Sequence, residues 1–395
     1  MYKISASIFL FFSFFPLQCI AESISFQFKG NTSYYQVERS NFSRYDNGKY
    51  TGLTHRETRS TMNGQFFEKK GIHFNGFFYV LEETLKDLSR TAQALDTIVE
   101  ASFSVFPTGE THFTIDNGYP RLRSFPVFPE TAISLGETWQ AEGIRVVDPK
   151  NSGKKTFLPV LVEYTFVKTE SYRGKDVHRI KARYATRLTK YSKIENEDPD
   201  LVLATGSHDV DILIDAESLT TRMILDRLDE IFTYENGDTI RLKGNTAIFT
   251  DDVYVKNKQK QIAHNFVELK QDSNFHVDET PQGIRLSIRD IKFIADSDNL
   301  LPEERERLDA LAKMLLSIPD GHFLVEGHTA SVGKKEGEKE LSIKRALKII
   351  LEMKTRGLRE EQFIYTGHGG ERPVADNEDA TGRAENRRVE ITILE

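Results

Sequence analysis

The stretch that decides the fold lies near the C-terminal end of the sequence and contains three short motifs. In order, they read Val325-Glu326-Gly327-His328-Thr329, Leu341-Ser342-Ile343-Lys344-Arg345-Ala346, and Gly382-Arg383-Ala384-Glu385-Asn386-Arg387-Arg388-Val389-Glu390. The first motif closes an apolar run typical of a buried strand, and the second has the apolar spacing of a helix. The third leads into a further apolar run. Three collinear motifs of this kind rarely arise by chance.

The segments around these motifs predict strands that alternate with helices. Apolar and polar residues alternate along 284–288, as in a strand with one buried face. A proline opens the segment 302–315, in which three leucines have helical spacing. Further strands are expected at 323–325, 363–365 and 389–393, and a second helix at 343–350 that Gly357 can end. This βαβαββ order predicts an α/β sandwich for residues 274–395.

This succession of motifs resembles the OmpA-like domain, with which many bacterial envelope proteins hold peptidoglycan. The resemblance covers roughly the final third of the chain. It implies a site for the free end of diaminopimelate in the peptidoglycan stem peptide. Because that end carries an ammonium and a carboxylate on one carbon, its receptor needs an anion and a cation close together.

The resemblance also implies which residues would form this site. The family's arginine on the second helix corresponds to Arg345, and a further ligand-facing arginine corresponds to Arg387. The family's aspartate, which follows a Gly-x-Thr sequence, corresponds to Ala330. Because a charge-assisted hydrogen bond contributes about 1.5–3 kcal/mol, its loss is expected to weaken binding about ten- to a hundredfold.

Other positions leave two interpretations open. Val332 and Glu338 stand where the family usually has a threonine and an asparagine, and Asp296 follows the first strand. In one interpretation Glu338 or Asp296 supplies the missing anion, and the domain binds the cell wall. In the other, the pocket has degenerated and the domain is a structural or protein-interaction scaffold. Arg345 could also simply pair with Glu338 or Glu340 on its own helix.

Residues 22–250 read mostly as antiparallel strands, so the expected fold class is an α+β multidomain protein. Asn47-Gly48 and residues 235–238 are hairpin signals. A seam near residue 150 would divide this region into two subdomains. Apolar residues at helical spacing between Leu81 and Ile98 predict a short helix. Charged residues between 82 and 87 interrupt the alternation required of strands that cross an outer membrane, which favours a curved antiparallel sheet.

The N-terminal segment 1–21 is typical of a secretory signal peptide. Lys3 precedes an uncharged apolar run, and Cys19 and Ala21 are the small residues expected before cleavage. Cys19 also permits a lipoprotein interpretation, although no small residue precedes it. The expected location is the periplasm or cell envelope, with association to the outer membrane left open. Residues 251–273 are polar and predict a linker.

Composition and motif spacing exclude several classes of function. The net charge is −7, from 53 basic and 60 acidic residues, which gives no basic surface typical of nucleic-acid binding. Cys19 is the only cysteine, and neither metal-binding His-Glu-x-x-His nor the Gly-x-Ser-x-Gly of hydrolases occurs. We therefore expect no cofactor, no metal and no enzymatic activity. The expected partners are the peptidoglycan stem peptide and other envelope proteins.

Overall fold

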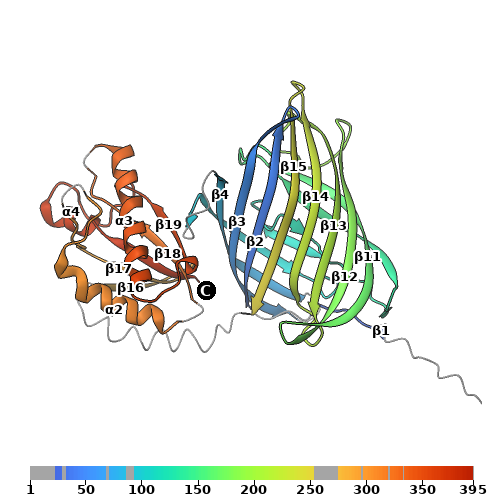
Figure 1. Ribbon diagram of the computed structural model, residues 1–395, viewed down its shortest axis with the longest axis horizontal. Coiled ribbons are helices and arrows are strands. Elements are labelled where there is room, and N and C mark those ends of the chain that lie inside the picture. The colour runs from blue at the N-terminus through green and yellow to red at the C-terminus, as the bar shows by residue number, and fades with distance from the viewer. Residues whose placement is uncertain are drawn as a thin grey trace, which may run out of the picture.

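A computed structural model describes residues 23–28, 33–67, 71–85, 93–252, 275–294, 297–318, 321–331 and 333–394. They form two domains, each built on a sheet (Figure 1). The expected signal peptide and nearly all of the expected linker lie outside the described residues. None of the helices in these ranges has the length and apolar character that a membrane crossing requires.

The N-terminal domain is a twelve-stranded antiparallel sheet that curves strongly around its own interior (Figure 1). Its strands follow the order β7-β6-β4-β3-β2-β15-β14-β13-β12-β11-β10-β8. The edge strands β7 and β8 approach one another where the Thr111 amide donates to the Ser124 hydroxyl at 3.0 Å. The strand bounds are β2 Ser33–Asp46, β3 Lys49–Phe67, β4 Gly71–Leu85, β6 Thr97–Val105, β7 Thr111–Ile115, β8 Leu122–Arg123, β10 Thr138–Val147, β11 Thr156–Tyr172, β12 Lys175–Leu188, β13 Leu201–Asp215, β14 Thr221–Tyr234 and β15 Thr239–Asp252; β1 Ser23–Ile24 and β9 Ile133–Ser134 form a separate pair.

The predicted hairpins are present. Asn47 and Gly48 join β2 to β3 with φ angles of 50° and 77°, which is the left-handed region that a tight hairpin turn requires. Gly237, with φ of 86°, lies in the turn between β14 and β15. On either side of residue 150, β10 and β11 pair with one another within the same sheet.

The helix expected between Leu81 and Ile98 is wrong at both ends of the segment, and residues 86–92 lie outside the described residues. Leu81 and Leu85 belong to strand β4, and Ile98 belongs to β6. The physical reason lies in the apolar run that ends at Leu81, because this part of β4 is buried on both faces. Phe78 and Val80 face the interior, whereas Tyr79 and Leu81 are buried by the C-terminal domain. A strand buried on both faces loses its alternation, so periodicity no longer identifies it.

The C-terminal domain is built on a six-stranded sheet of order β16-β17-β20-β18-β19-β5. Strands β18 and β19 are parallel, while β20 runs antiparallel to β17 and β18. Two of these strands were not expected from the sequence: β16, and β5, which comes from the N-terminal region. The bounds are β16 Phe275–Thr280, β17 Gly283–Ile288, η1 Pro302–Glu304, α2 Arg305–Leu316, β18 His322–Gly327, α3 Lys335–Thr355, η2 Glu360–Gln362, β19 Phe363–Gly367, α4 Ala380–Asn386, β20 Val389–Leu394 and β5 Gln93–Ala94.

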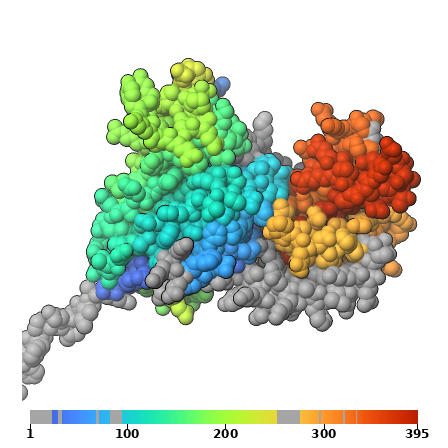
Figure 2. Space-filling view, turned by 180° about the vertical axis from the view of Figure 1, so that it is seen from behind, coloured from blue at the N-terminus to red at the C-terminus, as the bar shows by residue number. Residues whose placement is uncertain are grey.

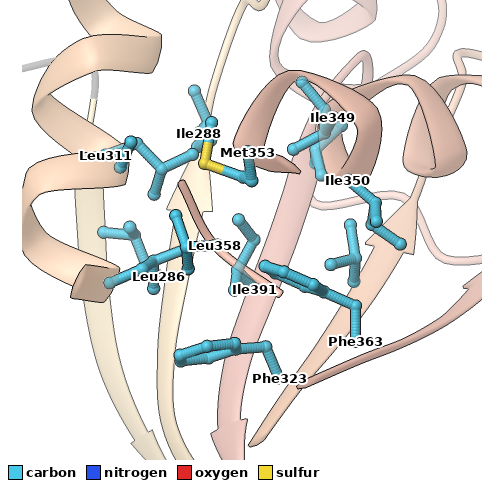
Figure 3. Close-up of a cluster of buried hydrophobic side chains, with 14 of the residues drawn as sticks. Leu286, Ile288, Leu311, Phe323, Ile349, Ile350, Met353, Leu358, Phe363 and Ile391 are labelled. Atoms are coloured by element: carbon cyan, nitrogen blue, oxygen red, sulfur yellow. The ribbon is translucent and has the colours of Figure 1, made fainter. Parts of the chain in front are cut away.

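One face of this sheet and the helices α2 and α3 share a hydrophobic core (Figure 3). Leu311 of α2 and Ile350 of α3 share this core with Phe323 of β18 and Ile391 of β20. Helix α3 ends as predicted, with Gly357 at a φ of 101° just beyond its last turn. The core fixes α3 on the sheet, and α3 carries the arginine of the second motif.

The other face of the C-terminal sheet packs on the outside of the curved sheet. Leu324, Ile364 and Leu394 form a buried cluster with Tyr79 and Leu81 of β4. At its edge the Tyr35 ring stacks on His322 with centroids 3.8 Å apart, and Arg59 donates to the Glu361 carbonyl at 3.0 Å. Seen from behind, the cyan segments near residue 100 lie directly against the orange and red C-terminal domain (Figure 2). The two domains therefore share an apolar interface.

Candidate functional site

A cleft of about 610 Å³ lies beside the N-terminal half of α3, and residues of the sequence motifs line it. Its walls come from the loop after β17, the loop after β18, helix α3 and the end of α4. The lining residues are Ser297, Asp298, Thr329, Ala330, Lys334, Gly337, Glu338, Glu340, Leu341, Lys344, Arg345, Arg383 and Arg387. The fold thus brings all three motifs to one place.

Arg345 is buried at the base of this cleft. Its Nε donates to the Ser297 carbonyl at 3.3 Å, and its guanidinium lies 4.6 Å from the ring centroid of Phe293. Both contacts hold the planar group in a fixed orientation, which suits bidentate binding of a carboxylate. Glu340, one of the two helix partners considered from the sequence, instead forms an ion pair with Lys344 at 2.7 Å.

Arg387 lies across the cleft, at the C-terminal end of α4, and is half-buried. Within the described ranges its guanidinium has no hydrogen bond or ion pair. The neighbouring Arg383 differs, since it donates to the carbonyls of Asn377 and Glu378 at 2.9 and 2.8 Å. Arg383 therefore holds the preceding loop, whereas the charge of Arg387 is available to a ligand.

The residues considered as the missing anion differ in how they are placed in the structure. Glu338 lines the cleft, but one of its carboxylate oxygens accepts from the Lys334 amide at 3.0 Å, at the start of α3. Ala330, which the resemblance aligns with the family's aspartate, lines the cleft and is 8% exposed. Asp296 and Val332 lie outside the described residues.

Sequence reasoning missed two polar groups of the cleft. Asp298 lines it, two residues after the predicted Asp296, and its carboxylate has no hydrogen-bond partner among the described residues. Thr329 is buried, and its hydroxyl also lacks a partner within those ranges. The loop after β17 has no periodic pattern that would have indicated Asp298. The threonine stood inside the quoted motif and was not considered as a ligand group.

The lining gives the cleft both signs of charge. Among the described residues, five basic side chains contribute to it, Lys334, Lys344, Arg345, Arg383 and Arg387, against the three acidic ones Asp298, Glu338 and Glu340. A small zwitterionic or anionic group fits such a site, because the arginines can bind a carboxylate and a nearby acid can accept from an ammonium. Unpartnered Thr329 and Asp298 leave hydrogen-bonding capacity for a ligand.

Comparison with known proteins places this domain in a family. Residues 292–387 match the model of the OmpA family. The putative lipoprotein YfiB of Escherichia coli strain K12 is 33% identical over 111 residues, which are 27% of this chain and 69% of that protein. The chain therefore belongs to the OmpA family, through its C-terminal domain.

Two further relatives share the same third of the chain. Outer membrane protein A of Bordetella avium is 34% identical over 105 residues, covering 27% of this chain and 54% of that protein. The peptidoglycan-binding protein ArfA of Mycobacterium tuberculosis strain ATCC 25618 / H37Rv is 33% identical over 103 residues, covering 26% of this chain and 32% of ArfA. The chain thus spans about half, or less, of the length of these two relatives.

Proposed function

We propose that this chain is a cell-envelope protein that docks non-covalently on peptidoglycan through the cleft beside α3. The observation that carries the proposal is the convergence of Arg345, Arg387 and Asp298 on one open cleft in a domain of the OmpA family. A relative of the same family, ArfA, is named as a peptidoglycan-binding protein. The ligand is the stem peptide, at the free end of its diamino acid.

The roles divide by charge. Arg345 and Arg387 bind the carboxylate of that end, and the fixed guanidinium of Arg345 sets its orientation. Asp298 accepts from the ammonium, in place of the aspartate that Ala330 replaces, with Glu338 and Asp296 as the other candidate anions. Thr329 provides a hydroxyl to the bound group. Because the ammonium is held by an acid from a different loop, we expect binding weaker than with an aspartate at 330.

The scaffold interpretation remains the second candidate, since Glu338 is engaged with the start of α3. The unengaged Arg387 and Asp298 favour a ligand, because both line the cleft without a hydrogen-bond partner for their side chains among the described residues. The two candidates differ in one measurable property, which is binding to isolated cell wall.

Co-sedimentation of the full chain with peptidoglycan sacculi tests the proposal. We expect the wild type to sediment with sacculi and Arg387→Ala to bind at least tenfold more weakly, with an unchanged melting temperature because Arg387 has no partner to lose among the described residues. Arg356→Ala is the matched control. That arginine lies just beyond the far end of α3 and pairs with Asp309 and Glu352. If the wild type fails to sediment, or if Arg387→Ala binds equally well, the proposal is wrong.

A further inference from the structure

The interior of the curved sheet contains a cavity that is separate from the cleft of the C-terminal domain. Its volume is about 140 Å³, and side chains from β2, β4, β6, β14 and β15 reach it. Aromatic rings form much of the wall, including those of Tyr34, Phe74, Phe103, Phe125 and Phe128. An apolar cavity of about 150 Å³ is large enough to hold a molecule of the size of benzene.

One end of this cavity is polar. Glu38 and Gln36 point into it from β2, and Gln36 donates to the Thr250 hydroxyl at 3.2 Å. Glu38 differs, because its carboxylate has neither a hydrogen bond nor an ion pair anywhere in the described ranges. Of the described residues that line the cavity, Glu38 alone is an Asp, Glu, Lys, Arg or His. Burial raises the pKa of Glu38, and the guanidinium groups of Arg121, Arg56 and Arg145 offset part of this effect.

Those arginines do not reach the aromatic cavity. They line a smaller adjoining cavity of about 40 Å³, which Glu38 also borders. There Arg145 forms two hydrogen bonds of 2.7 Å with Glu230, and Arg121 donates to the Tyr119 hydroxyl at 3.1 Å. A ligand in the aromatic cavity therefore meets a carboxylate at its polar end and no cationic side chain. The three arginines act on the Glu38 carboxylate only at longer range, so its oxygens can still accept a hydrogen bond from a donor in the aromatic cavity.

We propose that this cavity binds a small organic cation, with an apolar body about the size of one aromatic ring and an ammonium end that Glu38 accepts. The aromatic rings supply apolar contact, and the faces of such rings also attract a nearby cation. The site is independent of the peptidoglycan cleft.

Titration of the full chain with benzylamine, benzyl alcohol and benzoate tests this inference. Binding is measured by calorimetry and by ligand-observed NMR. These probes share one ring and differ in the charge of the attached group. We expect benzylamine to bind at least tenfold more tightly than benzoate. A fragment of this size that binds has a dissociation constant of about 10 mM or lower. Absence of benzylamine binding at about 10 mM therefore overturns the proposal.

Two variants locate the site. Glu38→Gln should lower benzylamine affinity at least tenfold and leave benzyl alcohol within about threefold, because it removes the charge and keeps the shape. Val105→Phe, which adds a ring to the cavity wall, should abolish binding of every probe. Melting curves confirm that each variant is folded. Unchanged benzylamine binding in either folded variant, or tighter binding of benzoate than of benzylamine, overturns the assignment.

Discussion

Arg345 and Arg387 occupy the same cleft but are held in different ways. The guanidinium of Arg345 is oriented by Ser297 and Phe293, whereas Arg387 has no partner in the described ranges. The sequence motifs pointed to both residues, because motif spacing fixes positions along a helix or strand, and both line the cleft. They did not indicate Asp298, since the loop after β17 has no periodicity from which side-chain direction can be read.

Replacing Ala330 by aspartate should strengthen peptidoglycan binding. Ala330 lines the cleft, so an aspartate there adds an anion to the cleft wall, as the proposed binding of an ammonium requires. A charge-assisted hydrogen bond contributes about 1.5–3 kcal/mol, so we expect the affinity for sacculi or soluble stem peptide to rise about ten- to a hundredfold. Ala330→Asn is the control, as a side chain of similar size without charge. Equal affinities for the aspartate and asparagine variants would contradict the assignment of this position.

Inside the curved sheet, Glu230 makes the stability of the N-terminal domain depend on pH. Burial by itself would raise the pKa of Glu230, but the Arg145 guanidinium and the His208 ring hold it well below its ordinary value of 4.5. A carboxyl with a depressed pKa in the folded state stabilises the fold above its unfolded-state pKa. As pH falls below about 4.5, the unfolded chain binds a proton that the folded chain does not, and stability decreases.

Urea unfolding between pH 7 and pH 3 measures this effect. Glu230→Gln should unfold about 3–5 kcal/mol more easily at pH 7, because Arg145 then lacks its buried partner. Its stability should also fall less steeply below pH 4.5 than that of the wild type. A variant with the wild-type slope would show that the acid sensitivity arises from other carboxyl groups.

Among the elements, α3 lies unusually close to the strands beneath it. A Cβ atom at Gly327 of β18 would overlap the backbone carbonyl oxygen of Ser342, and one at Gly367 of β19 would also meet Ser342 and Ile343. The Ser342 hydroxyl in turn accepts from the Gly369 amide at 2.9 Å. These glycines let α3 approach the sheet closely, and Arg345 of α3 lines the same cleft as Thr329.

Gly327→Ala should therefore push α3 away from the sheet. We expect a loss of about 1–3 kcal/mol in stability from the overlap, together with weaker binding to sacculi because Arg345 moves relative to Thr329. Gly337→Ala is the matched control, since nothing lies within 4 Å of its added methyl group. At this helical position alanine should stabilise the domain by about 0.5–1 kcal/mol. Thermal melting of both variants measures the difference. Equal melting temperatures would contradict a clash between a Cβ atom at position 327 and α3.

The sequence predicted elements well where pattern and turn chemistry agree. The strands flanking Asn47-Gly48 and the helix that Gly357 ends are present as predicted. The segment from Leu81 to Ile98 was misread because its outward residues are covered by another domain. The interior pairs of the curved sheet, such as Arg145 with Glu230, join residues far apart in the chain. Local periodicity contains no information about such partners.

In the molecule as a whole, the two domains are coupled through their apolar interface and through a shared strand. Strand β5, which comes from the N-terminal region, pairs in parallel with β19 of the C-terminal sheet. The Leu95 amide donates to the Tyr365 carbonyl, and the Asp96 amide donates to the Val80 carbonyl of β4. One short segment thus bonds to both sheets. The position of the cleft beside α3 is therefore fixed relative to the curved sheet.

Tyr79→Ala should uncouple the domains. Tyr79 is 1% exposed in the interface cluster, so its truncation leaves a cavity that costs about 3–5 kcal/mol. We expect calorimetry to show one unfolding transition for the wild type and two for the variant. Leu161→Ala is the control, because Leu161 is 58% exposed on the curved sheet and should change little. A single transition at the wild-type temperature in Tyr79→Ala would contradict the coupling.

In the proposed function, the cleft beside α3 binds the free end of the diamino acid in the stem peptide. Calorimetric titration of the full chain with two soluble stem peptides tests it most directly. One peptide ends in diaminopimelate and the other in lysine, which lacks the second carboxylate. We predict that the diaminopimelate peptide binds at least tenfold more tightly, and that this difference disappears in Arg387→Ala. Equal affinity for the two peptides, or no binding of either, would contradict the account.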